Sequence, residues 1–323
     1  MKKKLKIAII GFGNIGSKRL DSLIKIKNID ICYIVEKKKI FLKNIIKFKK
    51  NNKIIRNIKY LSSYKNLIDN KRRLVDAAII AIPPSKIYTI SSYLLKNNIN
   101  LLVEKPLGIN LNQTKKLTSL SLKKKVVLKT GFNLRFDTGI NYLKKNLKKA
   151  VGKAYYVKIQ YSNGAVKTNT NNIGALLDIG NHSLNLISYL FPRKNFSKIT
   201  NIQSSHEYHK DDNGFITLRS QDNIDFFIHY SFIVWKNKFE LEIGGKKGSA
   251  IVSSLPKWGH QKIIFYKRIF PSGIPKVTKN IFKIENSWLD ECKFFIKLCK
   301  EKKFIYNKEG LENMMMLNKL KKI

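Results

Sequence analysis

Three glycines near the start of the chain have the spacing of a turn that can hold a phosphate. Gly11, Gly13 and Gly16 directly follow a short apolar run, and Asn14 and Ile15 lie between the last two. In this setting the first glycine permits a tight turn, the second lets the backbone approach a pyrophosphate, and the third lets a helix pack closely on a strand. The helix N-terminus adds unpaired amides and a positive dipole end. The motif predicts a dinucleotide site, and the alternative is an accidental glycine-rich turn.

An acidic residue follows at the distance expected for the adenosine ribose. Glu36 lies twenty residues after Gly16, at the end of a second apolar run. A carboxylate there can accept hydrogen bonds from ribose hydroxyls and repel a 2′-phosphate, which favours NAD over NADP. NADP stays possible because Lys37, Lys38 and Lys39 come next and could neutralise a phosphate. The alternative for Glu36 is a solvated turn residue.

An acid, a lysine and a proline occur together after another apolar run. Glu104, Lys105 and Pro106 follow residues 99–103. The carboxyl ends of parallel strands are where ligands bind in doubly wound folds, so we expect Lys105 to face the cofactor crevice.

A carboxylate and an imidazole stand four residues apart in the second half of the chain. The spacing of Asp178 and His182 puts both side chains on one helical face, where the acid could orient the ring or both could reach one substrate. No further His or Cys pair is near them, so we predict no metal site. By itself such a pair can also be structural.

A parallel sheet in the first 130 residues would position the glycine turn and the lysine. Apolar runs alternate with helix-length segments, which is typical of an N-terminal Rossmann domain at 1–130. The predicted strands are residues 5–10, 30–35, 75–82, 99–103 and 126–130, and two predicted helices are residues 85–96 and 110–121.

The pattern changes after about residue 150, which predicts a second α/β domain at 131–323. A strand at 153–161 ends in an Asn-Gly turn, a helix spans 175–190, and several short strands follow. Residues 238–243 alternate apolar and charged side chains, as a half-solvated antiparallel strand does. We place the C-terminal helices in this domain.

The cysteines indicate core packing in a reduced protein. Cys292 and Cys299 recur at helical spacing with Trp288 and Phe295, and with Cys32 they form an odd, widely spaced set that predicts neither disulfides nor zinc. The basic start precedes an apolar run too short for a secretory signal, and no segment is long enough to span a membrane. We therefore expect a cytoplasmic protein with no membrane partner.

The charge suggests a polyanion partner, but its composition does not. The chain has 64 basic and 21 acidic residues, a net charge of +43, yet only eight of the basic residues are arginines. Arginine is the residue that reads bases and grips phosphate with two hydrogen bonds. Lysine, asparagine and isoleucine share AU-rich codons, so a biased genome accounts for the excess. We expect no nucleic-acid partner.

Together the three motifs resemble the glucose-fructose oxidoreductase/inositol dehydrogenase (Gfo/Idh/MocA) family. The resemblance covers nearly the whole chain and implies a Rossmann domain followed by an α/β domain with an open, mainly antiparallel sheet. That sheet often forms an oligomer interface, so a homo-oligomer, a dimer or tetramer, is expected. The implied substrate is a sugar, cyclitol or nucleotide-sugar.

The resemblance also assigns residues. Lys105 would be the family's catalytic lysine, next to Glu104 at the cofactor, and Pro83 would lie beside the nicotinamide. Asp178 and His182 would be the family's acid and histidine.

For substrate binding, the resemblance points to Asn133 and Arg135, and the polar loop at 161–172 adds Lys167 as a contact for a phosphate or carboxylate. The family usually has an acid three residues after the histidine, where this chain has Asn185.

The predicted function is hydride transfer between NAD(P) and a secondary hydroxyl or ketone of the sugar. His182 would be the base, and Lys105 would stabilise the reacting oxygen or serve as the base itself. Asp178 would orient the histidine or bind a neighbouring hydroxyl. Surface polysaccharide synthesis is a reasonable setting. The alternatives are NAD-dependent glycoside cleavage on the same scaffold, a non-catalytic cofactor sensor, and a polyanion-binding module.

Overall fold

A computed structural model of the chain describes residues 4–37, 57–166, 172–192, 194–271, 273–302 and 307–321. The chain divides into two compact units. The first comprises Met1–Phe132 with Trp288–Met314, and the second comprises Asn133–Ser287 with Met315–Ile323. Lys38, Lys39 and Lys167 lie outside the described residues.

The first unit contains a six-stranded sheet in which every neighbouring pair is parallel. Its order is β3-β2-β1-β6-β7-β8, which confirms the predicted doubly wound sheet. The strands are β1 (Leu5–Ile10), β2 (Ile29–Val35), β3 (Lys59–Leu61), β6 (Ala77–Ile80), β7 (Asn100–Glu104) and β8 (Leu128–Gly131). The chain order reverses between β1 and β6, so the ends of these two strands mark the switch point at which ligands bind.

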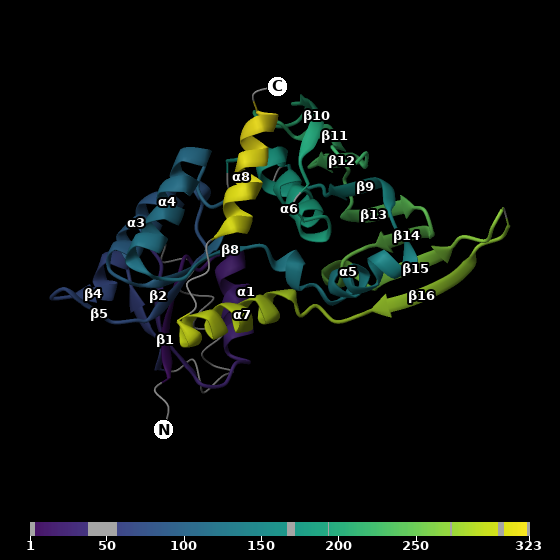
Figure 1. Ribbon diagram of the computed structural model, residues 1–323. Coiled ribbons are helices and arrows are strands. Elements are labelled where there is room, and N and C mark those ends of the chain that lie inside the picture. The colour runs from purple at the N-terminus through teal and green to yellow at the C-terminus, as the bar shows by residue number, and fades with distance from the viewer. Residues whose placement is uncertain are drawn as a thin grey trace. The chain divides into compact units, whose positions relative to one another are not determined.

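Helices and a small hairpin complete the first half of this unit (Figure 1). They are α1 (Asn14–Leu23), α3 (Pro84–Lys96), α4 (Leu111–Lys124), the 3-10 turn η2 (Tyr64–Leu67), and the short pair β4 (Ile68–Asp69) and β5 (Arg72–Arg73). Helix α4 begins as predicted, because the Asn110 side chain accepts a hydrogen bond from the Gln113 amide at 2.9 Å.

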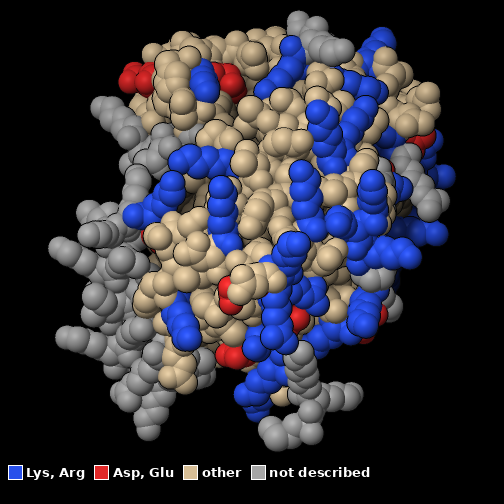
Figure 2. Space-filling view, turned by 90° about the vertical axis from the view of Figure 1, so that its left-hand side faces the viewer, with Lys and Arg blue, Asp and Glu red and all other residues tan. Residues whose placement is uncertain are grey.

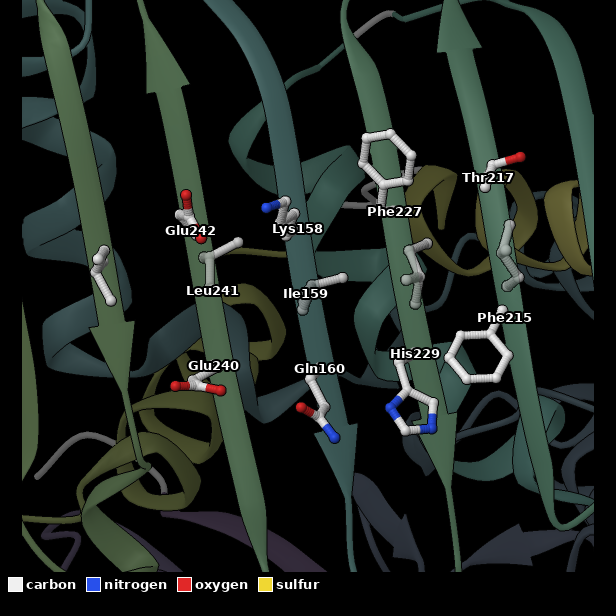
Figure 3. Close-up of a pocket in the computed structure, with 13 residues that line it drawn as sticks. Lys158, Ile159, Gln160, Phe215, Thr217, Phe227, His229, Glu240, Leu241 and Glu242 are labelled. Atoms are coloured by element: carbon white, nitrogen blue, oxygen red, sulfur yellow. The ribbon is translucent and has the colours of Figure 1, made fainter. Parts of the chain in front are cut away.

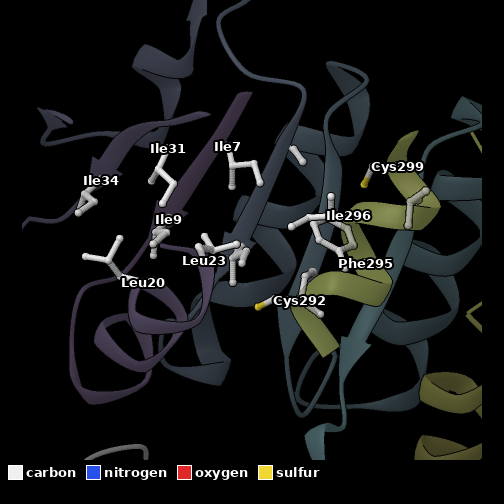
Figure 4. Close-up of a cluster of buried hydrophobic side chains, with 14 of the residues drawn as sticks. Ile7, Ile9, Leu20, Leu23, Ile31, Ile34, Cys292, Phe295, Ile296 and Cys299 are labelled. Atoms are coloured by element: carbon white, nitrogen blue, oxygen red, sulfur yellow. The ribbon is translucent and has the colours of Figure 1, made fainter. Parts of the chain in front are cut away.

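The helix α7 (Ser287–Glu301) packs on the first unit's sheet. Phe295 and Cys292 are fully buried in one cluster with Ile7 and Ile9 of β1 (Figure 4). The apolar stripe is therefore core, as its spacing predicts. This differs from the predicted place of the helix in the second domain, because helical periodicity shows which face is buried and not which sheet buries it. The last helix is α8 (Lys308–Leu320).

The second unit is built on an eight-stranded sheet of order β10-β11-β12-β9-β13-β14-β15-β16. All neighbouring pairs are antiparallel except β12 and β9, which confirms the mainly antiparallel sheet. The strands are β9 (Ala154–Ser162), β10 (Phe196–Ser204), β11 (Asn213–Ser220), β12 (Asp225–Ser231), β13 (Lys238–Gly245), β14 (Gly248–Ser253), β15 (Gln261–Lys267) and β16 (Lys276–Phe282).

Helices pack against this sheet at two places (Figure 1). They are α5 (Thr138–Ala150) near β14, β15 and β16, and α6 (Asn181–Leu190) with its preceding π-helical turn η5 (Leu176–Gly180) near β9 and β12. Short 3-10 turns occur at η3 (Asn133–Phe136) and η6 (Pro256–Trp258). Side chains of β11 alternate between buried and exposed, so the sheet leaves its other face open. No helix in the described ranges has the length and apolar character that crossing a membrane requires.

Candidate functional site

The glycine turn after β1 has the close packing that its residues predict. Gly11 has φ +87°, and a Cβ there would lie 2.3 Å from the Ala81 carbonyl oxygen at the end of β6. A Cβ on Gly16 would lie 2.1 Å from the Gly11 carbonyl oxygen, so only glycine lets α1 start this close to the turn. Both glycines are therefore required by the fold itself.

Gly13 differs, because the described structure leaves open space where its Cβ would stand. It is also the N-cap of α1, and no described side chain caps the helix there. The first amides of α1 thus face space that a group can enter, with Asn14 exposed and Ile15 half-buried beside it. A pyrophosphate fits such a site because it needs backbone amides and close approach.

Glu36 lies against this turn at the end of β2. Its Oε2 accepts a hydrogen bond from the Phe12 amide at 2.8 Å, and the Gly11 amide donates to the Val35 carbonyl at 2.9 Å. These two bonds hold the carboxylate beside the glycine turn, where the sequence places the ribose acid. Lys37 is exposed next to it.

Lys105 follows directly from β7, two strands from the glycine turn in the sheet order. It is half-buried, whereas Glu104 before it and Pro106 after it are buried, and the Lys105–Pro106 peptide bond is cis. Pro83 is exposed and is the N-cap residue of α3, after β6. Both residues thus lie at the carboxyl edge of the parallel sheet.

A buried arginine, which sequence reasoning missed, holds Glu104 in place. The Arg19 side chain on α1 is fully buried and donates from Nε to Glu104 Oε1 at 2.8 Å and from Nη2 to Glu291 Oε2 on α7 at 2.7 Å. Its guanidinium also lies 4.5 Å from the centre of the Trp288 ring. Burial alone would lower the pKa of Arg19, but the two carboxylates outweigh it and raise that pKa.

Two further charges extend this network. Lys129 on β8 pairs with Glu309 on α8, and its Nζ lies 3.8 Å from Glu291 Oε1. Burial raises the pKa of Glu291, although Arg19 and Lys129 both oppose that shift. One feature of the sequence could have indicated that Arg19 is buried. This residue is one of few arginines and lies beside Leu20 on the apolar face of α1.

Asp178 and His182 are the two half-buried residues of an otherwise buried helical segment. Between residues 173 and 187 every side chain is buried except these two, which are partly exposed. Asp178 belongs to the π-helical turn η5 and His182 to the first turn of α6. A π-helical turn widens the helix and is frequent at functional sites. The sequence predicted the shared face but not the π geometry.

Tyr161 contacts His182 and also a tryptophan and a lysine of the second unit. The Tyr161 ring centre at the end of β9 lies 5.7 Å from the His182 ring centre and 5.6 Å from that of Trp258 in η6. Lys257 Nζ donates to the Tyr161 hydroxyl at 2.9 Å. Sequence reasoning took Tyr161 only as the start of a polar loop and did not single out Lys257 or Trp258.

The predicted substrate residues have different settings. Arg135 Nε donates to Asn185 Oδ1 at 2.7 Å, and Asn185 is three residues after His182 on α6. Asn133 is only 5% exposed, and its amide donates to Ser287 Oγ at 2.8 Å. Arg135 is thus bonded to the helix that carries His182, whereas Asn133 is buried and bonded to Ser287.

Two family descriptions match the chain in order. Residues 5–132 match the Gfo/Idh/MocA oxidoreductase family's NAD-binding Rossmann fold, and residues 144–282 match its C-terminal alpha/beta domain. The chain belongs to the Gfo/Idh/MocA oxidoreductase family. Its first unit is an NAD(P)-binding Rossmann domain. This agrees with the glycine turn and with the strand order of the six-stranded sheet.

Individual relatives of this Gfo/Idh/MocA protein are distant. YceM of Salmonella typhimurium, which is assigned as an oxidoreductase, is 33% identical over 90 residues, and the match spans 28% of either chain. The solved structures that it resembles share its fold at low identity, so they support the architecture alone.

Three of those structures show how widely this fold is used. UDP-N-acetylglucosamine 3-dehydrogenase GnnA from Acidithiobacillus ferrooxidans is 15% identical with a TM-score of 0.80, over 98% of this chain and 96% of that one. GenD2 from gentamicin A biosynthesis, in complex with NAD, is 16% identical with a TM-score of 0.81, over 100% of this chain and 94% of that one. KijD10, a 3-ketoreductase from Actinomadura kijaniata in complex with NADP and TDP-benzene, is 13% identical with a TM-score of 0.83, over 99% of this chain and 97% of that one.

A hollow of about 360 Å³ lies on the open face of the eight-stranded sheet, away from the predicted site residues. Phe215, Phe227 and His229 line it together with charged side chains of β9 and β13 (Figure 3). Phe215 stacks on His229 with ring centres 4.4 Å apart, yet Phe215 and Phe227 are 49% and 45% exposed. This face therefore presents two large apolar rings to solvent among charged side chains.

The basic residues of the protein are widely spread. In Figure 2, Lys and Arg side chains are distributed over the face shown, with uncharged residues between them. Such a distribution is typical of a solvated surface. Among the described residues, no three His, Cys, Asp or Glu side chains are grouped so that they could hold a metal ion.

Proposed function

We propose that this protein transfers a hydride between NAD(P) and a secondary hydroxyl or ketone carbon of a sugar, cyclitol or nucleotide-sugar. The observation that carries the proposal is that Asp178 and His182 are half-buried in a segment whose other side chains are buried from residue 173 to 187. Both side chains keep part of their surface accessible, so an acid and an imidazole one turn apart can reach the same bound molecule. In a family of NAD-binding oxidoreductases, such a pair suits proton transfer.

Each proposed residue has a separate task. His182 takes the proton of the substrate hydroxyl, because an imidazole can accept and return a proton near neutral pH. Asp178, one turn away, orients the ring or binds a neighbouring hydroxyl. Lys105 donates a hydrogen bond to the reacting oxygen and stabilises its developing negative charge. Bound NAD(P) would supply the hydride acceptor.

The cofactor would be held by the glycine turn and by Glu36. The α1 amides next to Gly13 would bind the pyrophosphate, and Glu36 would accept from the ribose hydroxyls, which favours NAD. Pro83 and Glu104 would lie near the nicotinamide end.

The substrate class rests on the relatives. GnnA is named as a nucleotide-sugar dehydrogenase and KijD10 as a 3-ketoreductase. We propose a related sugar as substrate here, in a step of surface polysaccharide synthesis.

Turnover with purified protein tests this function. The protein is incubated with NAD or NADP and a panel of sugars, cyclitols and nucleotide-sugars, while the absorbance of the reduced cofactor is followed. Lys105→Met and His182→Asn should each lower kcat by about 100-fold or more, as loss of an acid-base or oxyanion group does, while NADH still binds. Near-normal turnover in both variants would contradict the assignment. Product analysis separates net oxidation from glycoside cleavage, in which the bound cofactor returns to its starting state.

We also propose that the open sheet face binds a second copy of this chain. The face combines exposed phenylalanines with Lys158, Glu240 and Glu242. Lysine and glutamate on one surface allow the same patch to pair with itself around a two-fold axis. A homo-oligomer would bury the exposed rings.

A further inference from the structure

Lys257 is an exposed lysine that contacts two aromatic side chains of the second unit. It lies in the turn η6 between β14 and β15, and its Nζ donates to the hydroxyl of the buried Tyr161 at 2.9 Å. The same Nζ lies 4.4 Å from the centre of the Trp258 ring and 5.5 Å from that of Tyr161. The phenol oxygen of Tyr161 and the Trp258 ring therefore hold this ammonium in place.

No carboxylate in the described part of the chain forms an ion pair with Lys257. An ammonium has three N–H donors, and the contact with Tyr161 uses one of them. The positive charge is thus positioned by neutral groups and keeps donors for another molecule. Lysine commonly binds phosphate as such a point charge.

Tyr161 contacts both the ammonium and the proposed base. Tyr161 contacts Lys257 through its hydroxyl and lies beside His182, with ring centres 5.7 Å apart. Trp258 is only partly buried, so an indole surface stands beside the ammonium. A flat apolar ring next to a fixed cation suits a ligand that has both a ring and a negative charge.

We propose that Lys257, Trp258 and Tyr161 form a subsite next to His182 for a negatively charged group on the sugar substrate. The charged group is a phosphate, a diphosphate or a carboxylate, bound by Lys257, while Trp258 stacks on the attached ring. This subsite rests on the proposed function, since it takes His182 as the site of reaction. It narrows the substrate class from sugars in general to anionic sugars.

Binding measurements test the subsite without any turnover. Isothermal titration of the NADH-loaded protein uses UDP, glucose 6-phosphate and glucuronate as anionic probes and glucose as the neutral probe. The variants are Lys257→Met, Lys257→Arg and Trp258→Leu. The matched control is Lys262→Met, which removes an exposed lysine of β15 and hence the same net charge. Thermal unfolding shows that each variant is folded.

We expect at least one anionic probe to bind about 10-fold more tightly than glucose, because a hydrogen bond to a charged group is worth about that ratio. Lys257→Met should remove most of this difference in affinity, and Lys257→Arg should keep it. Trp258→Leu should weaken the binding of the same probe. UDP as the preferred probe identifies a nucleotide-linked sugar, glucose 6-phosphate a sugar phosphate, and glucuronate an acidic sugar.

Two results would overturn the subsite. One is equal binding of every probe by the wild type and Lys257→Met, including no binding at all. The other is an equal loss in Lys262→Met, which would show a general effect of the high positive charge. Failure of the proposed function looks different: no sugar is oxidised or reduced, although anionic probes still bind through Lys257.

Discussion

Replacing Arg19 by methionine should destabilise the first unit by about 3 kcal/mol. The substitution keeps an unbranched side chain of similar length but removes the cation that Glu104 and Glu291 share. Glu104 is 9% exposed and Glu291 is fully buried, so neither carboxylate can recover its solvation in water. Removing one partner of a buried ion pair usually costs about 3–5 kcal/mol.

The lower end of that range applies here. Lys129 Nζ lies 3.8 Å from Glu291 Oε1 and still compensates part of its charge after the substitution. A double variant, Arg19→Met with Glu291→Gln, should lose about 1–3 kcal/mol less than the sum of the single variants, because the two side chains contact each other directly.

Urea unfolding measures this loss in the unit concerned. Trp288 is the one tryptophan of the first unit, so replacing Trp235 and Trp258 by phenylalanine makes fluorescence report that unit. The transition midpoint and its slope then give the free energy of unfolding. Lys18→Met is the control, since Lys18 is exposed on the same helix and its loss should change stability by no more than about 0.5 kcal/mol.

The pH dependence makes the prediction sharper. Burial already raises the pKa of Glu291, and Arg19 opposes that shift, so the pKa rises further in Arg19→Met. A carboxyl whose folded pKa exceeds its unfolded pKa binds more protons in the folded state, and its contribution to stability falls as pH rises. The deficit of Arg19→Met should therefore be larger at pH 8 than at pH 5. A loss below about 1 kcal/mol at pH 8, well under the usual cost of breaking a buried pair, would refute the reasoning.

Four further predictions concern other parts of the protein. Gly13→Ala should lower NADH affinity about 10-fold with little change in stability. Gly11→Ala should destabilise the fold by about 1–3 kcal/mol, because φ is +87° at that position. NADH titration and urea unfolding compare the two variants, and equal losses of stability would contradict the distinction. Glu36→Ser should raise the NADP over NAD ratio of kcat/KM by about 10-fold, since it removes a charge that repels the 2′-phosphate; an unchanged ratio would exclude that role. Burial raises the pKa of Asp137 from 3.8 to about 6, so its contribution to stability falls as the pH rises through that interval. Between pH 4 and pH 7 the stability of Asp137→Asn should therefore rise by up to about 3 kcal/mol relative to that of the wild type. Parallel pH profiles of the two proteins in urea unfolding would contradict this prediction. Phe227→Asp should convert an oligomer to a monomer in light scattering, and a wild type that is already monomeric would disprove the interface.

The sequence by itself determined the Rossmann sheet and the position of the glycine turn. Both are local: an apolar run buried on two faces, three glycines at set spacing and a helix start lie within about a dozen neighbouring residues, and backbone sterics leave few ways to arrange them. The shared face of Asp178 and His182 was predictable for the same reason. The catalytic and binding roles of these residues remain predictions.

Only the tertiary structure decided which distant residues meet. Arg19 joins Glu104 and Glu291, which are 85 and 272 residues away in sequence, and Lys257 reaches Tyr161 across 96 residues. Periodicity shows that a helix buries one face but leaves open which sheet covers that face, so the place of α7 beside β1 was not predictable. The pairing of buried charges depends on that packing, because a charge is stable in the interior only where the fold brings it a partner.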